Sequence, residues 1–385
     1  MVKSLLLIAR IVVGVLFIFS GLIKANDPLG LSYKMQEFFE VWGIHGLNNF
    51  TLFLSVVMIT LEIIAGVAVL LGWKMNFFSW LLLLLILFFT FLTGYALFSG
   101  KIRECGCFGD CIPLQAHHSF IKDLILLGLI AFIFYYRRMI RAVIPVRYTL
   151  MILFFSLIFT FSFQWYVLQH LPVVDCLPFK VGNDINEKMK IPVGALPDST
   201  VITFVYDKKG KEVEFTADKF PDDFNDADYK FLKRYDKLVR KGTALPQIRD
   251  FSLTTESGTD TTEAILADPQ YQFLVFTNST RDVGEGWKDN FHALHLELQK
   301  ENIPVHFVTS NAANTRAWLV ETLGNVPVSV LTCDATAIKT AARVNPTFYL
   351  VNRGIIMNKW SYADLVEAIR LVRSTEIEST NNEAP

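Results

Sequence analysis

The first 170 residues contain few charged side chains, and this scarcity excludes a water-soluble fold for that part of the chain. Nearly all aspartates and glutamates come after residue 171, where the composition is that of an ordinary soluble region. The soluble part lacks a basic run with interleaved aromatic residues, so we expect no nucleic-acid partner. The formal net charge of -1 is therefore the average of two unlike halves.

Long apolar runs predict five membrane-spanning helices, because a helix needs roughly 20 apolar residues to cross about 30 Å of hydrocarbon. Strands are excluded because an open sheet edge in lipid leaves backbone groups without hydrogen-bond partners. The first run could also be a signal peptide, but it is long and no small-x-small cleavage site follows it. The predicted spans are residues 5–23, 52–73, 77–98, 120–136 and 148–168.

Positive charge in short loops is retained on the cytoplasmic side and sets the orientation. The loop between the fourth and fifth predicted spans is rich in arginine and has no acidic residue. The arginines are Arg137, Arg138, Arg141 and Arg147. Residues 26–50, residues 100–119 and everything after His170 are then expected on the outer side. For a bacterial inner membrane this is the oxidising periplasm.

The outer segments carry their own structural signals. Residues 25–49 have apolar residues at helical spacing and predict a short amphipathic helix at the membrane interface. Residues 172–242 predict a small strand-rich unit with a hairpin turn at Asp207-Lys208-Lys209-Gly210. Within this unit, the polar stretch after Asp223 is expected to be helical through Arg240.

The last part of the chain alternates predicted strands and helices. This alternation over residues 243–373 predicts an α/β sandwich around a mixed sheet. Residues 374–385 are polar, and we expect a disordered tail. The predicted organisation is thus an α-helical membrane bundle over residues 1–140, a fifth transmembrane helix within 141–171, and the two soluble units.

Four cysteines are predicted on the outer face. Cys105, Cys107 and Cys111 share one loop, and Cys176 lies just past the fifth span. These thiols are candidates for disulfide exchange, since the nearby cations Lys101 and Arg103 would favour the thiolate.

Three other interpretations of the cysteines remain open. One is a purely structural disulfide, for example between Cys111 and Cys176. Another is a metal site completed by His117 or His118, although Cys-x-Cys is not the usual zinc spacing, so we expect no metal. The third is inert, unpaired thiols.

Glu62 falls near the middle of the second predicted span. A carboxylate there costs several kcal/mol, so a functional role in proton transfer is the default hypothesis. The alternative is a structural hydrogen bond to another helix, through Thr90 or Thr93.

The membrane part resembles the DoxX/MauE family of small membrane proteins. The residues that carry the resemblance are Arg10-Ile11-Val12-Val13-Gly14, Phe19-Ser20-Gly21-Leu22-Ile23-Lys24, Asp27-Pro28, Leu61-Glu62, Gly66 and Cys105-Gly106-Cys107-Phe108-Gly109. The resemblance implies a four-helix membrane bundle and a role in periplasmic electron or disulfide transfer, linked to quinone in some members. MauE itself is a maturation factor that works beside a thioredoxin-like partner. The fifth span and the soluble tail depart from this pattern.

The soluble tail resembles periplasmic thioredoxin-like proteins of the TlpA type. The matching residues are Leu245-Pro246, Asp250-Phe251-Ser252-Leu253 and Val344-Asn345-Pro346-Thr347-Phe348-Tyr349-Leu350. The resemblance implies that Pro346 occupies the cis-proline position beside the active site. Asn278-Ser279-Thr280-Arg281 stands where such domains carry Cys-x-x-Cys, so the domain is expected to be degenerate. The remaining cysteine, Cys333, is expected to be a buried small hydrophobe near the end of a strand.

Two functions from different classes follow. The first is a membrane thiol/disulfide oxidoreductase in which Cys105, Cys107, Cys111 and Cys176 exchange electrons, Glu62 handles a proton and the tail docks a partner protein. The second is a membrane scaffold or maturation factor with structural cysteines. Transport of a small ligand is a third, weaker alternative.

Overall fold

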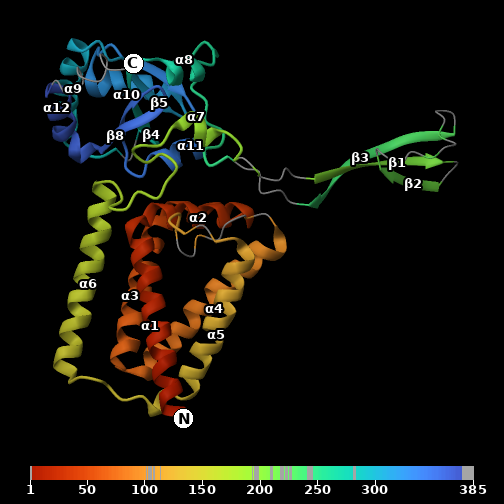
Figure 1. Ribbon diagram of the computed structural model, residues 1–385, viewed down its shortest axis with the longest axis vertical. Coiled ribbons are helices and arrows are strands. Elements are labelled where there is room, and N and C mark those ends of the chain that lie inside the picture. The colour runs from red at the N-terminus through yellow and green to blue at the C-terminus, as the bar shows by residue number, and fades with distance from the viewer. Residues whose placement is uncertain are drawn as a thin grey trace.

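The protein is described by a computed structural model in which a helical bundle, an α/β domain and a projecting arm are distinct (Figure 1). The described residues are 2–100, 102, 106, 109–112, 114–192, 194, 199–208, 211–216, 221, 224, 228–240, 246–280 and 283–374. The expected disordered tail lies outside this set, apart from its first residue.

The membrane bundle contains five helices that are long and apolar enough to cross a membrane, within the described part of the chain. The prediction of five spans is confirmed. The spans correspond to α1 (Val2–Asn26), α3 (Thr51–Leu71), α4 (Met75–Ser99), α5 (Ala116–Tyr135) and α6 (Val146–Gln169). The bundle also includes the shorter helix α2 (Pro28–Val41). The chain reaches the end of the bundle nearest the α/β domain three times, after α1, α4 and α6, and this end is called the outer end below (Figure 1).

Small residues let α1 and α3 approach closely. A Cβ atom added at Gly66 would lie 2.9 Å from the backbone oxygen of Gly14, so the two backbones are nearly in contact. Such small-residue contacts are how transmembrane helices gain packing energy where lipid removes the hydrophobic driving force.

The short helix α2 lies across the outer end of the bundle (Figure 1). Asp27 caps it by accepting a hydrogen bond from the Gly30 amide at 2.9 Å, and Pro28 occupies its first turn. Its buried face includes Met35 and Phe38, while Ser32 donates to Thr51 at the start of α3 at 2.9 Å. The predicted short helix in this segment is therefore confirmed.

The α/β domain is built on a five-stranded mixed sheet of order β6-β5-β4-β7-β8. The strands are β4 (Tyr271–Thr277), β5 (Val305–Thr309), β6 (Ser329–Thr332), β7 (Thr347–Asn352) and β8 (Ile355–Ser361). Strands β4, β5 and β6 are parallel, whereas β7 and β8 are antiparallel to their neighbours. The predicted mixed sheet is confirmed.

Helices cover both faces of this sheet. The covering helices are α7 (Ile185–Met189), α8 (Thr262–Ala267), α9 (Lys288–Lys300), α10 (Ala312–Leu323), α11 (Ala335–Ala341) and α12 (Leu365–Arg373). One apolar core joins the sheet to α9, α10 and α12, and the other joins it to α7, α8 and α11. Phe179 and Ile185, expected in the strand-rich unit, pack in the second core beside Phe251 and Phe276.

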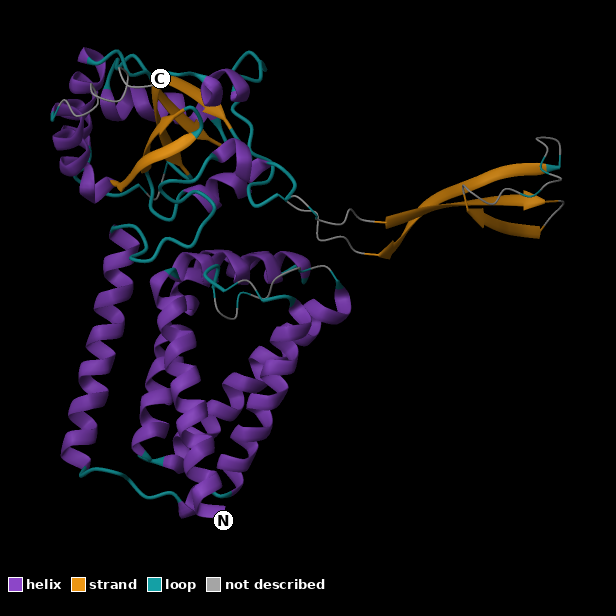
Figure 2. Ribbon diagram, viewed as in Figure 1, coloured by secondary structure: helices purple, strands orange, loops and turns teal. Residues whose placement is uncertain are grey.

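The arm is an antiparallel three-stranded sheet of order β2-β1-β3 that projects away from the rest of the molecule (Figure 2). Its strands are β1 (Ser199–Lys208), β2 (Lys211–Thr216) and β3 (Tyr229–Arg240). The predicted hairpin is confirmed, but the helix predicted through Arg240 is wrong. Strand β3 pairs along its length with β1, from Tyr229 opposite Lys208 to Arg240 opposite Ser199. This cross-strand pairing overrides the helical preference of its lysines and arginines.

Candidate functional site

A disulfide joins Cys111 to Cys176 across 65 residues of sequence. Cys111 lies in the outer loop between α4 and α5 (residues 100–115), and Cys176 lies in the linker between α6 and the α/β domain (residues 170–178). The loop between α4 and α5 and the linker that leaves the bundle after α6 are therefore covalently tied. The pairing is one of the interpretations that the sequence left open.

Cys105 and Cys107 lie outside the described residues, but Gly106 between them is described. Its φ of +68° is in the left-handed region, which glycine adopts at little cost. A Cβ atom at Gly106 would lie 3.0 Å from Cγ of Lys34 on α2. Gly106 therefore lies against α2, beside Lys34.

Arg343 connects the α/β domain to the bundle. It precedes β7, is 5% exposed, and its Nε donates to Asp27 at 2.7 Å while its Nη2 donates to Asp110 at 2.7 Å. Burial alone would lower the pKa of Arg343, but the two carboxylates offset this and raise it. Asp110 directly precedes Cys111, so Arg343 also fixes the outer loop beside the disulfide.

Lys359 makes a second such connection. Its Nζ lies 3.0 Å from Asp175, which directly precedes Cys176. The Lys359 side chain is 1% exposed, and burial lowers its pKa although Asp175 opposes the shift. The linker is thus held against β8 by a buried cation.

The carboxyl end of β4 faces α2. The Asn278 side chain donates to the hydroxyl of Tyr33 at 3.2 Å, and the Asn278 amide donates to Oδ1 of Asn345 at 3.1 Å. The Asn345–Pro346 peptide bond is cis, as the resemblance implied for Pro346. Burial raises the pKa of Tyr33, which therefore stays protonated as a hydrogen-bonding group. This end of the sheet is covered by the protein's own membrane bundle.

Glu62 is buried in α3 and forms an ion pair with Lys24 of α1. Lys24 Nζ lies 2.8 Å from both carboxylate oxygens, and Ser20 donates to Glu62 at 2.8 Å. Glu62 thus has the hydrogen bond to another helix that the sequence left as an alternative, but its partners are on α1, and Thr90 and Thr93 were the wrong partners. Both threonines lie on α4, where Thr90 donates to the backbone of Ile86 and Thr93 donates to Asp123.

Most partners in this site were not predicted from the sequence. Lys24 stands at the end of an apolar run, and a cation opposite a buried Glu62 is the signal that could have found it. Arg343 and Asp110 are 233 residues apart, and Lys359 and Asp175 are 184 apart, so no local pattern links either pair.

Among the described residues, no group of three or more His, Cys, Asp or Glu side chains could hold a metal ion. The polar groups within the bundle pair with one another, since Ser20 and Lys24 donate to Glu62 and Thr93 donates to Asp123.

Cys333 is buried in the α/β domain directly after β6. It is 3% exposed, and burial raises the pKa of its thiol to about 11. A thiol with that pKa is almost entirely protonated at neutral pH and is a poor nucleophile.

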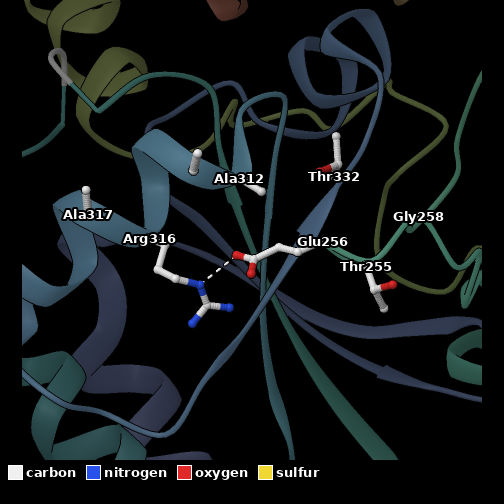
Figure 3. A pocket seen from close by; sticks show the side chains of 8 residues that line it. Thr255, Glu256, Gly258, Ala312, Arg316, Ala317 and Thr332 are labelled. Carbon is white, nitrogen blue, oxygen red and sulfur yellow. Dashed lines mark hydrogen bonds and ion pairs between the residues drawn. The ribbon is translucent and has the colours of Figure 1, made fainter.

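An open pocket of about 710 Å³ lies elsewhere on the α/β domain, between α10 and the end of β6 (Figure 3). Glu256 and Arg316 point toward each other across it and pair at 2.6 Å. Its other lining residues are Thr255, Gly258, Ala312, Ala313, Ala317 and Thr332. The pocket has no thiol or imidazole and stays outside the candidate site.

Two protein families match parts of the chain, and one of them covers the first four membrane spans. Residues 2–136 match the family described as methylamine utilisation protein MauE. Residues 200–241 match a domain of unknown function, DUF8463, and these residues coincide with the arm. Curated proteins give no match to the chain. This is a multi-pass membrane protein whose first four spans are similar to MauE.

Proposed function

We propose that the protein exchanges thiols and disulfides at the outer face of the membrane in which it sits, with Cys105 and Cys107 as the exchanging pair. The observation that carries this proposal is the Cys111–Cys176 disulfide. It commits two of the five cysteines to each other, and Cys333 is buried with a raised pKa. Cys105 and Cys107 are the pair that this elimination leaves.

The thiolate is the nucleophile in disulfide exchange. The stem of Lys34 packs against Gly106, which lies between the two cysteines in sequence, and the Lys34 ammonium pairs with Glu37 at 3.0 Å. Because Glu37 neutralises this ammonium, the assignment of the pair rests on the elimination.

The exchange is a balanced two-electron step. A thiolate of a substrate protein attacks one sulfur of the Cys105–Cys107 disulfide, and the other sulfur leaves as a thiolate. The second substrate thiol then attacks the mixed disulfide and releases the first sulfur. The substrate leaves with a disulfide, and Cys105 and Cys107 hold the two electrons and two protons.

We further infer that this surface faces the periplasm of a bacterial inner membrane. A structural disulfide persists in an oxidising compartment, and Cys111–Cys176 lies on the side opposite the arginine-rich loop between α5 and α6.

The α/β domain is proposed to be a degenerate thioredoxin-like domain. The central strand β4, its parallel neighbour β5 and the antiparallel pair β7 and β8 support this assignment. So does the hydrogen bond between Asn278, where the redox pair would begin, and Asn345 beside Pro346. Because α2 covers this end of the sheet, the domain is proposed to act as a cap for the bundle. Docking of a partner protein by the soluble region stays a prediction.

The experiment uses the full-length protein in detergent with a synthetic peptide that carries two thiols. We expect oxidation of the peptide by the oxidised protein, seen by mass as the loss of two hydrogens, and much slower oxidation by Cys105→Ser or Cys107→Ser, in which the Cys111–Cys176 disulfide remains. The matched control is Cys333→Ser, which should exchange at the wild-type rate. Unchanged exchange in both loop variants would overturn the proposal.

A second candidate function is a scaffold or maturation factor of the accessory kind that the MauE name describes. The observation that favours it is the covered end of β4, where Asn278 contacts Tyr33 and Cys-x-x-Cys is absent. This function predicts no peptide oxidation by the wild-type protein, so the same experiment separates the two.

A further inference from the structure

Each cysteine of the Cys111–Cys176 disulfide directly follows an aspartate that pairs with a cation of the α/β domain. Asp110 pairs with Arg343 at 2.7 Å, and Asp175 pairs with Lys359 at 3.0 Å. In the sequence, Arg343 lies before β7, and Lys359 lies after it, in β8. The domain therefore holds the backbone on both sides of one disulfide.

The burial of the two cations makes these contacts matter. The side chains of Arg343 and Lys359 are 6% and 1% exposed. A buried cation that loses a paired carboxylate loses compensating charge, which is unfavourable. Lys359 would lose Asp175, whereas Arg343 would lose Asp110 and keep Asp27. The docked position of the domain thus requires Asp110 and Asp175 to stay close to each other, as the disulfide holds them.

We propose that the Cys111–Cys176 disulfide and the docking of the α/β domain form one redox-sensitive latch. When a dithiol reductant takes the place of the disulfide, two electrons and two protons pass to Cys111 and Cys176, and the reductant leaves as a disulfide. The outer loop and the linker are then no longer joined. Docking weakens, and the surface formed by Tyr33, Asn278 and Arg343 opens.

The coupling acts in both directions, because linkage between two equilibria is reciprocal. Docking holds the two thiols near each other and favours the disulfide. Loss of either cation therefore makes the disulfide easier to reduce. This latch does not depend on exchange by Cys105 and Cys107, and it is tested in a Cys105→Ser/Cys107→Ser background.

The first test is a redox titration of Cys111 and Cys176 in that background, with dithiothreitol at fixed ratios of its oxidised and reduced forms. We expect Arg343→Met and Lys359→Met to lower the equilibrium constant for disulfide formation by roughly 5- to 150-fold, the usual range of such couplings. Arg316→Met is the matched control, since Arg316 pairs with Glu256 on the surface of the same domain. Equal constants in all four proteins would overturn the proposal.

The second test leaves the cations in place and so does not depend on whether those variants fold. Hydrogen exchange is compared in the same background with Cys111–Cys176 oxidised and reduced. The latch predicts faster exchange on reduction in α2 and in residues 341–346, with unchanged exchange in the central strands β4 and β5. Identical exchange in α2 and residues 341–346 would overturn it, and so would faster exchange throughout the α/β domain, which indicates unfolding rather than undocking.

Discussion

The guanidinium of Arg343 lies 2.7 Å from the carboxylate of Asp27, which also caps α2 through the Gly30 amide. The Asp27 carboxylate thus caps the first turn of α2 and also binds Arg343 of the α/β domain. The domain contact and the local fold of the bundle surface therefore depend on the same residue.

Substitutions at Asp27 should separate its two roles. Asp27→Asn keeps a side-chain acceptor for the Gly30 amide but removes the charge facing Arg343, so it should weaken docking alone. Asp27→Ala removes the cap as well and should cost about 1 kcal/mol more in unfolding free energy. Denaturant titration of the full-length protein in detergent measures both. Equal losses for the two variants would show that the cap contributes nothing.

The ion pair between Glu62 and Lys24 should be needed for stability. Glu62→Gln leaves the buried Lys24 ammonium without its countercharge, and we expect a loss of about 3–5 kcal/mol in unfolding free energy. Lys24→Met/Glu62→Met removes both charges and should recover most of this loss. The check is thermal unfolding in detergent. A double variant that is less stable than Glu62→Gln would contradict this prediction, because it would show that the loss in Glu62→Gln does not come from the unpaired charge of Lys24.

Close packing of α1 against α3 should make Gly66 intolerant of a side chain. Gly66→Ala places a methyl group against the Gly14 backbone oxygen and the Ile18 side chain, and overpacking of this kind costs about 1–3 kcal/mol. Gly128→Ala in α5 is the matched control, because nothing lies within 4 Å of its added Cβ. The control should be neutral or slightly more stable, as alanine favours helix. Equal stability of the two variants, measured by thermal unfolding, would contradict the close packing.

Acid should destabilise the α/β domain through His306. Its ring nitrogens contact Ser329 and Gln272, and burial lowers the pKa from 6.5 to about 4. The unfolded chain takes up a proton near pH 6.5 and the folded domain does not. The stability present above that pH is therefore lost as pH falls toward 4, by up to about 3 kcal/mol. Denaturant unfolding between pH 7.5 and 4.5 measures this slope, and His306→Gln should flatten it.

The parts of the fold that sequence predicts well are those with a long, regular pattern. Apolar runs of membrane length made all five spans visible in the sequence. Strand β3 was not recognised from the sequence, because its alternation of aromatic and charged residues also suits a surface helix. Its pairing with β1, which decides the matter, joins residues such as Ser199 and Arg240 that lie far apart in sequence.

The candidate site was only half visible in the sequence for a related reason. Glu62 was evident because a carboxylate is rare in an apolar span, and the loop cysteines were evident from their clustering. Arg343 looks like any surface arginine until folding brings it to Asp27, 316 residues away. Contacts of this range depend on the docking of two separate domains, which no local pattern encodes.

The most direct test of the proposed function is the redox state of the outer cysteines in intact cells, by differential alkylation and mass spectrometry with and without respiratory inhibition. We predict that Cys111 and Cys176 remain oxidised, while Cys105 and Cys107 are a mixed population that shifts when respiration stops. A single fixed state for Cys105 and Cys107 under both conditions would contradict thiol/disulfide exchange and favour the scaffold.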